Sequence, residues 1–109
     1  MNIIHLESGS HPGPCLRLEG DCDLYSVPAA YRALEGELRD GGALHLDFGA
    51  VSYLDSCGVG MIIRLLQAAR IMRTEVTFSG LAGSPRKVLA MSNILPILKE
   101  SPCPMDGPR

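Results

Sequence analysis

Strand and helix patterns alternate along this chain, and their order limits the folds that it can adopt. Residues 43–48 (ALHLDF) and 74–81 (TEVTFSGL) carry apolar side chains at alternate positions, which predicts two strands. The intervening residues 58–72 instead have the apolar spacing of a helix. Residues 3–7 and 15–20 also alternate, and the turn residues between them predict a hairpin.

Two more helices are expected from their end signals. The first has Ser26 as its candidate N-cap and Pro28 in its first turn, and it is expected to stop at Gly41–Gly42. The last would have Ser84 as its cap and Pro85 at its first helical position. The resulting order, β-β-α-β-α-β-α, predicts an α/β fold in which one mixed β-sheet is covered by α-helices.

The length of the chain fits one domain. Its 109 residues lie within the usual size of a single domain. We assign residues 1–100 to this domain, with residues 93–100 (NILPILKE) packing back on the core. Residues 101–109 are expected to form a flexible C-terminal tail.

Charge and hydropathy argue against several kinds of partner. Lys and Arg number 10 against 12 Asp and Glu, so the net charge is −2 and there is no basic surplus to attract nucleic acid or anionic lipid. Residues 1–15 lack the features of a signal peptide, and Arg64 interrupts an apolar stretch too short to span a membrane. We therefore expect a cytoplasmic protein with no membrane insertion and no nucleic-acid partner.

The four cysteines and three histidines do not show the spacing of a metal site. No C-x-x-C pair is present, and structural zinc sites usually include close ligand pairs. We therefore predict no metal and no cofactor. Cys15, Cys22 and Cys103 are interpreted as core or tail residues without a function, with the free thiols that are usual in a reducing cytosol.

The helix expected over residues 58–72 has a narrow polar stripe. Its apolar residues are too many for one sheet-facing stripe of the usual width. Two explanations remain open: neighbours flank the helix on both sides, or part of its apolar surface is left for a partner. The polar residues of the stripe are Arg64, Gln67, Arg70 and Arg73.

Residues 53–61 (YLDSCGVGM) gather an acid, a hydroxyl, a thiol and two glycines at a strand-to-helix junction, where ligands and partners are often bound. Ser56 lacks a base for nucleophilic catalysis, since His45 is expected to point to the polar face of its strand. A helix N-terminus would lower the pKa of the Cys57 thiol, and a lowered pKa is one of the features that a reactive thiol needs. Two glycines are too few for a dinucleotide-binding fingerprint. We predict no catalytic residue.

Two interpretations of Ser56 follow from the residues alone. In one, Ser56 caps the helix while Asp55 accepts hydrogen bonds from backbone amides. In the other, Ser56 is phosphorylated, which adds about −1.5 to −2 charge at a helix start that tolerates it. Asp55, with Asp21 or Asp23 if they lie close, would then make the patch strongly negative and repel a partner fitted to the unmodified face.

Residues 46–70 (LDFGAVSYLDSCGVGMIIRLLQAAR) resemble the core signature of the STAS family, the anti-sigma-factor antagonists and their relatives. In that signature a strand ending in D-[FL]-S-x-V leads to a [FMY]-x-D-S-[SA]-G-[LV]-G loop and a helix. Residues 18–34 (LEGDCDLYSVPAAYRAL) resemble the G-x-[LV]-D segment and helix of the family, and residues 76–98 resemble its final strand and helix. The resemblance spans roughly residues 14–98 and implies a STAS-like fold.

The resemblance implies a regulatory protein and not an enzyme. In regulatory members, an ATP-dependent anti-sigma-factor kinase phosphorylates the serine that follows the loop aspartate, and the unphosphorylated form binds that kinase so that it releases its sigma factor. By motif position this serine is Ser56. The implied partner-binding residues are Asp23, Asp55, Ser56, Cys57, Gly58, Val59 and Gly60.

The sequence departs from the family pattern at several positions. Cys57 stands where many members have serine, Gly49 where a strand-end serine is common, and residues 93–95 (NIL) where S-G-L is usual. Gly49 and the missing glycine in residues 70–76 (RIMRTEV) point to a divergent member with a different partner. Other members are scaffold subunits of a lipid-transport ABC complex, which hold their partner through the same loop-and-helix face. A scaffold in such a complex or in another signalling assembly is therefore the alternative function.

Overall fold

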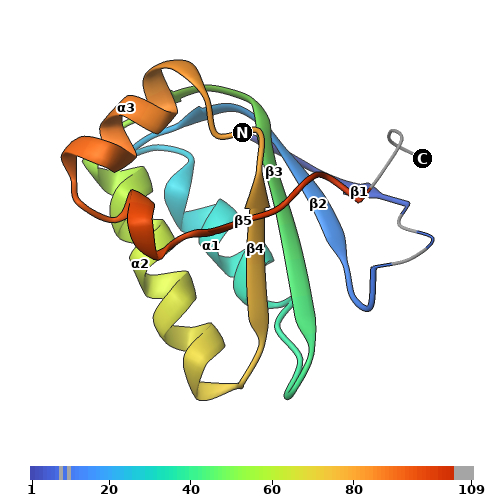
Figure 1. The fold of residues 1–109 in the computed structure, drawn as a ribbon. Coiled ribbons are helices and arrows are strands. Elements are labelled where there is room, and N and C mark those ends of the chain that lie inside the picture. Colours follow the sequence, from blue (N-terminus) through green and yellow to red (C-terminus); the bar gives the residue numbers. More distant parts are fainter. Residues whose placement is uncertain (8, 10, 105–109) are drawn as a thin grey trace.

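The computed structural model describes residues 1–7, 9 and 11–104, and it contains a five-stranded sheet with helices against one face (Figure 1). Its elements are β1 (Asn2–Leu6), β2 (Cys15–Cys22), α1 (Val27–Glu35), β3 (Ala43–Leu54), α2 (Ser56–Ile71), β4 (Glu75–Ser79), α3 (Gly83–Met91), the 3-10 helix η1 (Leu95–Ile97) and β5 (Lys99–Glu100). The strands lie in the order β1-β2-β3-β4-β5. The β1–β2 pair is antiparallel and the other three pairs are parallel, which confirms the predicted mixed sheet.

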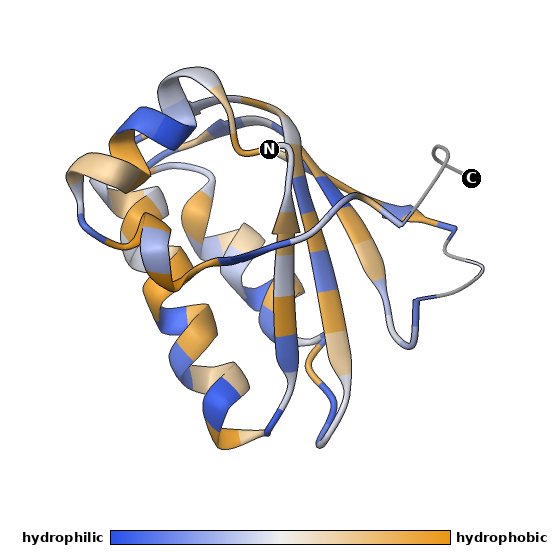
Figure 2. Ribbon diagram, in the orientation of Figure 1, coloured by the Kyte–Doolittle hydropathy of each residue, from blue (hydrophilic) through white to orange (hydrophobic). Residues whose placement is uncertain are grey.

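Hydrophobic side chains fill the space between the sheet and the helices. Leu16, Leu46 and Phe78 come from β2, β3 and β4, and Leu34 and Leu65 reach them from α1 and α2; all five are fully buried. Burial of a side chain of this kind contributes about 1.5–3 kcal/mol. Apolar and polar residues alternate along the strands (Figure 2), so the sheet has an apolar face toward the helices and a more polar face on its other side.

The longest helix, α2, is partly covered on both flanks. On one side the guanidinium of Arg64 lies 4.2 Å from the ring centre of Tyr31 in α1. On the other side Ile63 lines a shallow pocket with Ile97 of η1. Ile63 and Ile71 nevertheless remain exposed. The narrow polar stripe therefore reflects flanking neighbours together with some uncovered apolar surface. No helix in the described ranges has the length and apolar character needed to cross a membrane.

The β3 strand is longer than its sequence pattern indicates. Its alternation stops at residue 48, but the strand continues to Leu54, and its second half pairs with the end of β2, where Cys22 lies opposite Leu54. Register shifts between β2 and β3 interrupt the regular alternation, and for this reason the second half does not have the pattern of a strand. The helix that follows begins at Ser56, two residues before the predicted start at Gly58.

The ends of α1 also differ from their sequence signals. The helix stops at Glu35 and not at Gly41–Gly42, because Gly36 already starts a tight turn outside the helix. Ser26 occupies the N-cap position but makes no side-chain cap bond. Its hydroxyl donates instead to the backbone oxygen of Asp21 at 2.8 Å.

The α3 helix starts two residues earlier than predicted. It begins at Gly83, so that Ser84 and Pro85 both lie inside its first turn. The N-cap position falls on Ala82, whose side chain has no oxygen to accept a hydrogen bond. Ser84 is therefore an exposed first-turn residue and not the cap.

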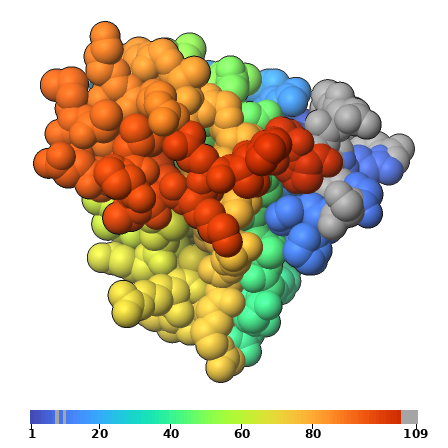
Figure 3. Space-filling model, viewed as in Figure 1, coloured from blue at the N-terminus to red at the C-terminus, as the bar shows by residue number. Residues whose placement is uncertain are grey.

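After α3 the chain returns to the sheet. The β5 strand is parallel to β4, with Glu100 opposite Phe78. The amide of Ser101 then donates to the backbone oxygen of Phe78 at 2.8 Å. Residues 101–104 were expected to belong to a flexible tail, but they run across the sheet on the face opposite the helices (Figures 1 and 3). Residues 105–109 of the expected tail lie outside the described residues.

Candidate functional site

Asp55 is the N-cap of α2. Its backbone is extended, and its Oδ1 accepts hydrogen bonds from the amides of Cys57 at 2.9 Å and Gly58 at 3.2 Å. These amides belong to the first turn, where a helix supplies no partner of its own. Ser56 is the first residue of the helix and is exposed. The interpretation of Asp55 as the acceptor of these amides is therefore confirmed, whereas the cap is Asp55 and not Ser56.

The end of β2 brings further acids to the same edge of the sheet. The amide of Asp55 donates to the backbone oxygen of Cys22 at 3.3 Å, so the residues that follow Cys22 lie beside the start of α2. One of them is Asp23. Asp21, the residue before Cys22, accepts a hydrogen bond from the hydroxyl of Ser52 in β3 at 2.9 Å. Asp21, Asp23 and Asp55 thus all lie at the carboxyl ends of two adjacent strands.

Asp23 organises the loop between β2 and α1. Its Oδ1 accepts hydrogen bonds from the amides of Tyr25 and Ser26, each at 3.0 Å, and its own amide donates to the hydroxyl of Ser26. The backbone bond from Ser26, with a smaller contribution from that of Tyr25, lowers the pKa of Asp23, because both bonds favour the ionised form. Asp23 is therefore a carboxylate at neutral pH that also fixes the shape of this loop.

Cys22 lies beneath the acids and is not a reactive thiol. Burial raises its pKa to about 11, and the negative charges of Asp55 and Asp23 raise it further in the same direction. A thiol with such a pKa is almost entirely protonated at neutral pH and is a poor nucleophile. Cys57 is half-buried and not in a disulfide. The predicted effect of the helix N-terminus on Cys57 remains a prediction.

The two glycines of the motif have different surroundings. A Cβ on Gly58 would lie 2.5 Å from Cδ1 of Leu54 and 2.9 Å from both the backbone oxygen and the sulfur of Cys22. Gly58 is thus needed for the first turn of α2 to pack on the ends of the strands. A Cβ on Gly60 would meet nothing within 4 Å. Val59 is 7% exposed and belongs to the core, so its side chain supports the site from within.

Large exposed side chains flank the acids, and sequence reasoning did not identify them. Leu24 and Tyr25 follow Asp23 directly and are 62% and 89% exposed. Tyr53, 48% exposed, lies opposite Asp21 in the β2–β3 pair. The sequence did contain a signal for this exposure. Leu24 and Tyr25 are large apolar residues in a predicted loop, where no strand or helix pattern would place them in the core. Together they add an apolar surface to an acidic one.

His45 is not a base for Ser56. It faces away from the helices, as predicted for the polar side of its strand, but it is fully buried there. Its Nδ1 lies 2.7 Å from Oγ1 of Thr77 and its Nε2 lies 2.8 Å from Oγ of Ser79, both in β4. Burial lowers its pKa. Cys103 lies close to this ring, and the ring of His11 contacts it edge-on with the centroids 5.9 Å apart, so both help to cover this part of the polar face.

Comparison with known proteins gives the family. A model of the STAS domain matches residues 6–104, which is most of the chain. This chain belongs to the STAS domain family. The motif around Ser56 and the acids at the end of β2 both lie inside the matched region.

Relatives of this STAS domain are anti-sigma factor antagonists. The anti-sigma-B factor antagonist of Listeria monocytogenes is 27% identical over 81 residues, which cover 73% of this chain and 71% of the relative. SpoIIAA in its unphosphorylated form has a TM-score of 0.70 at 18% identity, with 90% of this chain and 87% of that chain covered. Its phosphorylated form, from Bacillus, has a TM-score of 0.63 at 19% identity, with 90% of each chain covered. An anti-sigma factor antagonist from Mycobacterium paratuberculosis has a TM-score of 0.71 at 18% identity, with 93% and 86% covered.

Proposed function

We propose that this STAS domain is an anti-sigma-factor antagonist, a binding protein whose complex with an anti-sigma-factor kinase is broken by phosphorylation of Ser56. The observation that carries the proposal is an exposed hydroxyl at the first position of α2, beside a carboxylate that already caps the helix. In this function the domain is the substrate of a kinase and not itself an enzyme. The proposed contact residues are Asp23, Asp55, Ser56, Cys57 and Gly60, and the buried Gly58 and Val59 would support this face from within.

The geometry favours a change of surface without a change of fold. The amides of Cys57 and Gly58 already donate hydrogen bonds to Asp55. A phosphate on Ser56 would therefore not be needed as a helix cap, and it would not have to displace the Asp55 carboxylate. It would add about −1.5 to −2 charge next to Asp55, on an edge that also holds Asp21 and Asp23. The helix dipole would offset part of this charge, so the folded state persists.

The unmodified face has the mixed character of a partner surface. Tyr25 and Tyr53 offer exposed rings next to the carboxylates, and aromatic side chains are enriched in protein interfaces. Gly60 leaves open space in the first turns of α2, where a partner could approach the backbone. New negative charge in the middle of such a face would repel acidic groups and interrupt apolar contacts with the bound partner.

The names of the relatives agree with this role. The Listeria relative is an anti-sigma-B factor antagonist, and SpoIIAA is an anti-sigma factor antagonist described in unphosphorylated and phosphorylated forms. We extend that role to this chain on the strength of the shared motif and of the exposed Ser56. A serine-kinase type of anti-sigma factor is the corresponding partner.

The experiment has a modification arm and a binding arm. The purified protein is incubated with ATP and the kinase-type anti-sigma factor of its own organism, and peptide mass spectrometry is expected to place one phosphoryl group on Ser56. Calorimetric titration then compares the wild type with Ser56→Ala, which should retain binding, and Ser56→Asp, which should weaken it at least tenfold, or by about 1.4 kcal/mol.

Ser84→Asp is the matched control. Ser84 is also an exposed serine in the first turn of a helix, but α3 carries no acidic cap, and Ser84→Asp should bind like the wild type. Unchanged binding by Ser56→Asp, together with no phosphoryl group after incubation, would contradict the proposal. Binding to the nucleotide-binding subunit of a transporter, independent of Ser56, would instead support the scaffold alternative.

A further inference from the structure

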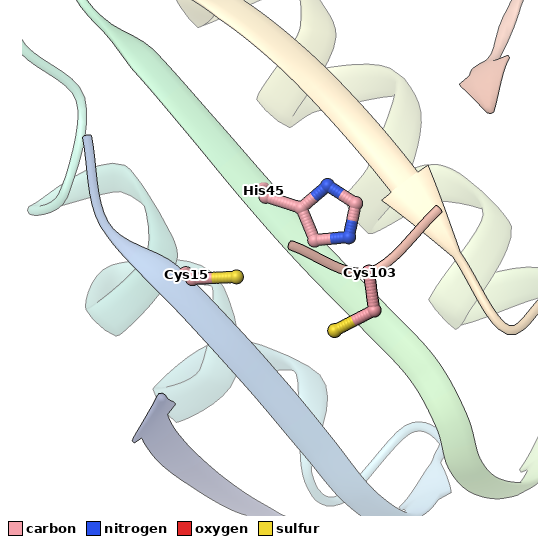
Figure 4. A group of neighbouring side chains, drawn as sticks. All are labelled: Cys15, His45 and Cys103. Carbon is pink, nitrogen blue, oxygen red and sulfur yellow. The ribbon is translucent and has the colours of Figure 1, made fainter. Parts of the chain in front are cut away.

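Three metal-ligating side chains meet on the sheet face opposite the helices, at a place that the proposed function does not use. Cys15 comes from β2, His45 from β3 and Cys103 from the segment that follows β5 (Figure 4). They are separated by 30 and 58 residues in sequence, so no spacing rule could identify them. Figure 4 shows both sulfur atoms pointing into the space beside the imidazole ring.

The distances between the ligand atoms fit a metal ion. The two sulfur atoms and one imidazole nitrogen all lie within 4.8 Å of one another. A tetrahedral Zn²⁺ with Zn–S and Zn–N bonds of ordinary length holds such atoms about 3.4–3.8 Å apart. Cys103 belongs to a covering segment and is half-buried, so a shift of up to about 1 Å in this segment would complete the site without moving the sheet.

His45 would give up one of its two side-chain hydrogen bonds on becoming a metal ligand. Its ring nitrogens lie against the hydroxyls of Thr77 and Ser79, at 2.7 and 2.8 Å. If one nitrogen turns to a metal, the other still has a hydroxyl on β4, and such a second partner orients most histidine ligands. Burial keeps the imidazole neutral by lowering its pKa, and the neutral form is the one that binds metals.

Without a metal, the buried Cys15 thiol lies beside a second sulfur, that of Cys103. Burial raises the pKa of Cys15 to about 12, and its closeness to Cys103 raises it as well. Asp47 acts in the same direction, and Arg17, which is paired with Asp47, acts against it. A divalent cation would take the place of both thiol protons, which would pass to solvent, and its charge would stabilise the two thiolates.

We propose that Cys15, His45 and Cys103 form a binding site for a thiophilic divalent cation, Zn²⁺, that fastens residues 101–104 to β2 and β3. Two thiolates and one imidazole are a donor set that suits zinc, and three protein ligands leave a fourth position for solvent. An open pocket borders Cys103 and is also lined by Asp47 and Ser79, so that water has access to that position.

Zinc binding to the full chain tests the site directly. Protein freed of metal and kept under a thiol-free reductant is titrated with Zn²⁺ against a chromophoric chelator, and Co²⁺ is used in parallel as a spectroscopic probe. We expect one equivalent of Zn²⁺ per chain, a higher melting temperature with Zn²⁺ bound, and a thiolate-to-cobalt charge-transfer band.

Two half-buried free cysteines provide a matched pair of variants. Cys103→Ser should bind Zn²⁺ at least about tenfold more weakly and lose the charge-transfer band, whereas Cys57→Ser should retain both. Circular dichroism establishes that both variants are folded. The proposal is overturned if the wild type takes up no Zn²⁺, if Cys103→Ser binds it as tightly as the wild type, or if a Cys15–Cys103 disulfide persists under the reductant.

Discussion

Replacement of Gly58 by alanine tests how tightly the start of α2 packs on the strand ends. The added methyl would lie 2.5 Å from Cδ1 of Leu54 and 2.9 Å from the backbone oxygen and the sulfur of Cys22. The two side-chain atoms could move, but the backbone oxygen of Cys22 is held by its strand pairing and by the amide of Asp55. Part of the clash therefore has to be taken up by a shift of the helix.

The expected loss follows from two opposing effects. Overpacking of a well-filled site costs about 1–3 kcal/mol. Alanine in a helix is better than glycine by about 1 kcal/mol, and this gain offsets part of the cost. Gly60→Ala has the same gain without the clash, because nothing lies within 4 Å of its Cβ position. The difference between the two variants should then be the overpacking cost alone, about 1–3 kcal/mol.

Urea unfolding of the wild type and both variants measures this difference. We expect the free energy of unfolding to fall in Gly58→Ala and to rise by up to about 1 kcal/mol in Gly60→Ala, with the same dependence on urea concentration. Equal stabilities of the two variants would show that the packing of Gly58 on Cys22 and Leu54 contributes nothing to the free energy of unfolding.

Two further predictions concern the acids at this edge of the sheet. Asp55→Ala should lower the free energy of unfolding by about 1 kcal/mol, since it removes the cap of α2, while Asp55→Asn, which can still accept those hydrogen bonds, should lose less in the same urea experiment. Because the pKa of Asp23 is lowered in the folded protein, its contribution to stability is present above about pH 4 and is lost as the pH falls through the folded-state pKa. Carboxyl-detected NMR titration should find this lowered pKa, and Asp23→Asn should remove the corresponding part of the pH dependence of unfolding; an ordinary pKa for Asp23 would contradict the hydrogen bonding described for its loop.

Local patterns in the sequence were sufficient for the type and order of the main elements. Alternation predicted β1, β2, β4 and the first half of β3, and helical spacing predicted α2, because strands and helices that bury one face repeat their apolar residues with periods of two and about 3.6. The junction before α2 could also be located, since the polar motif at residues 53–61 stands between two such patterns. The sequence shows that Gly58 and Gly60 are glycines, but it does not show that Gly58 is packed against Cys22 and Leu54 while Gly60 has open space beside it.

Features that depend on pairing between distant segments could not be found in this way. The second half of β3 is a strand because it pairs with β2, and its register shifts remove the alternation that would reveal it. The choice of Asp55 as the cap depends on where α2 begins, and that point is set by the end of this same pairing. A shift of one residue in the start of α2 would make Ser56 the cap in place of Asp55.

The order of residues alone is enough to establish the composition of the two sheet faces and the position of a serine between an acid and a helix. Which of these residues lie next to one another depends on the folded arrangement. His45 was correctly assigned to the polar face, but its burial depends on residues 101–104, more than 50 positions away along the chain. Cys15 and Cys103 also lie close to His45 only because the fold brings distant segments of the chain together. The physical cause is that periodicity reports the direction of a side chain relative to its own element, whereas contacts across a sheet depend on how the elements are arranged in space.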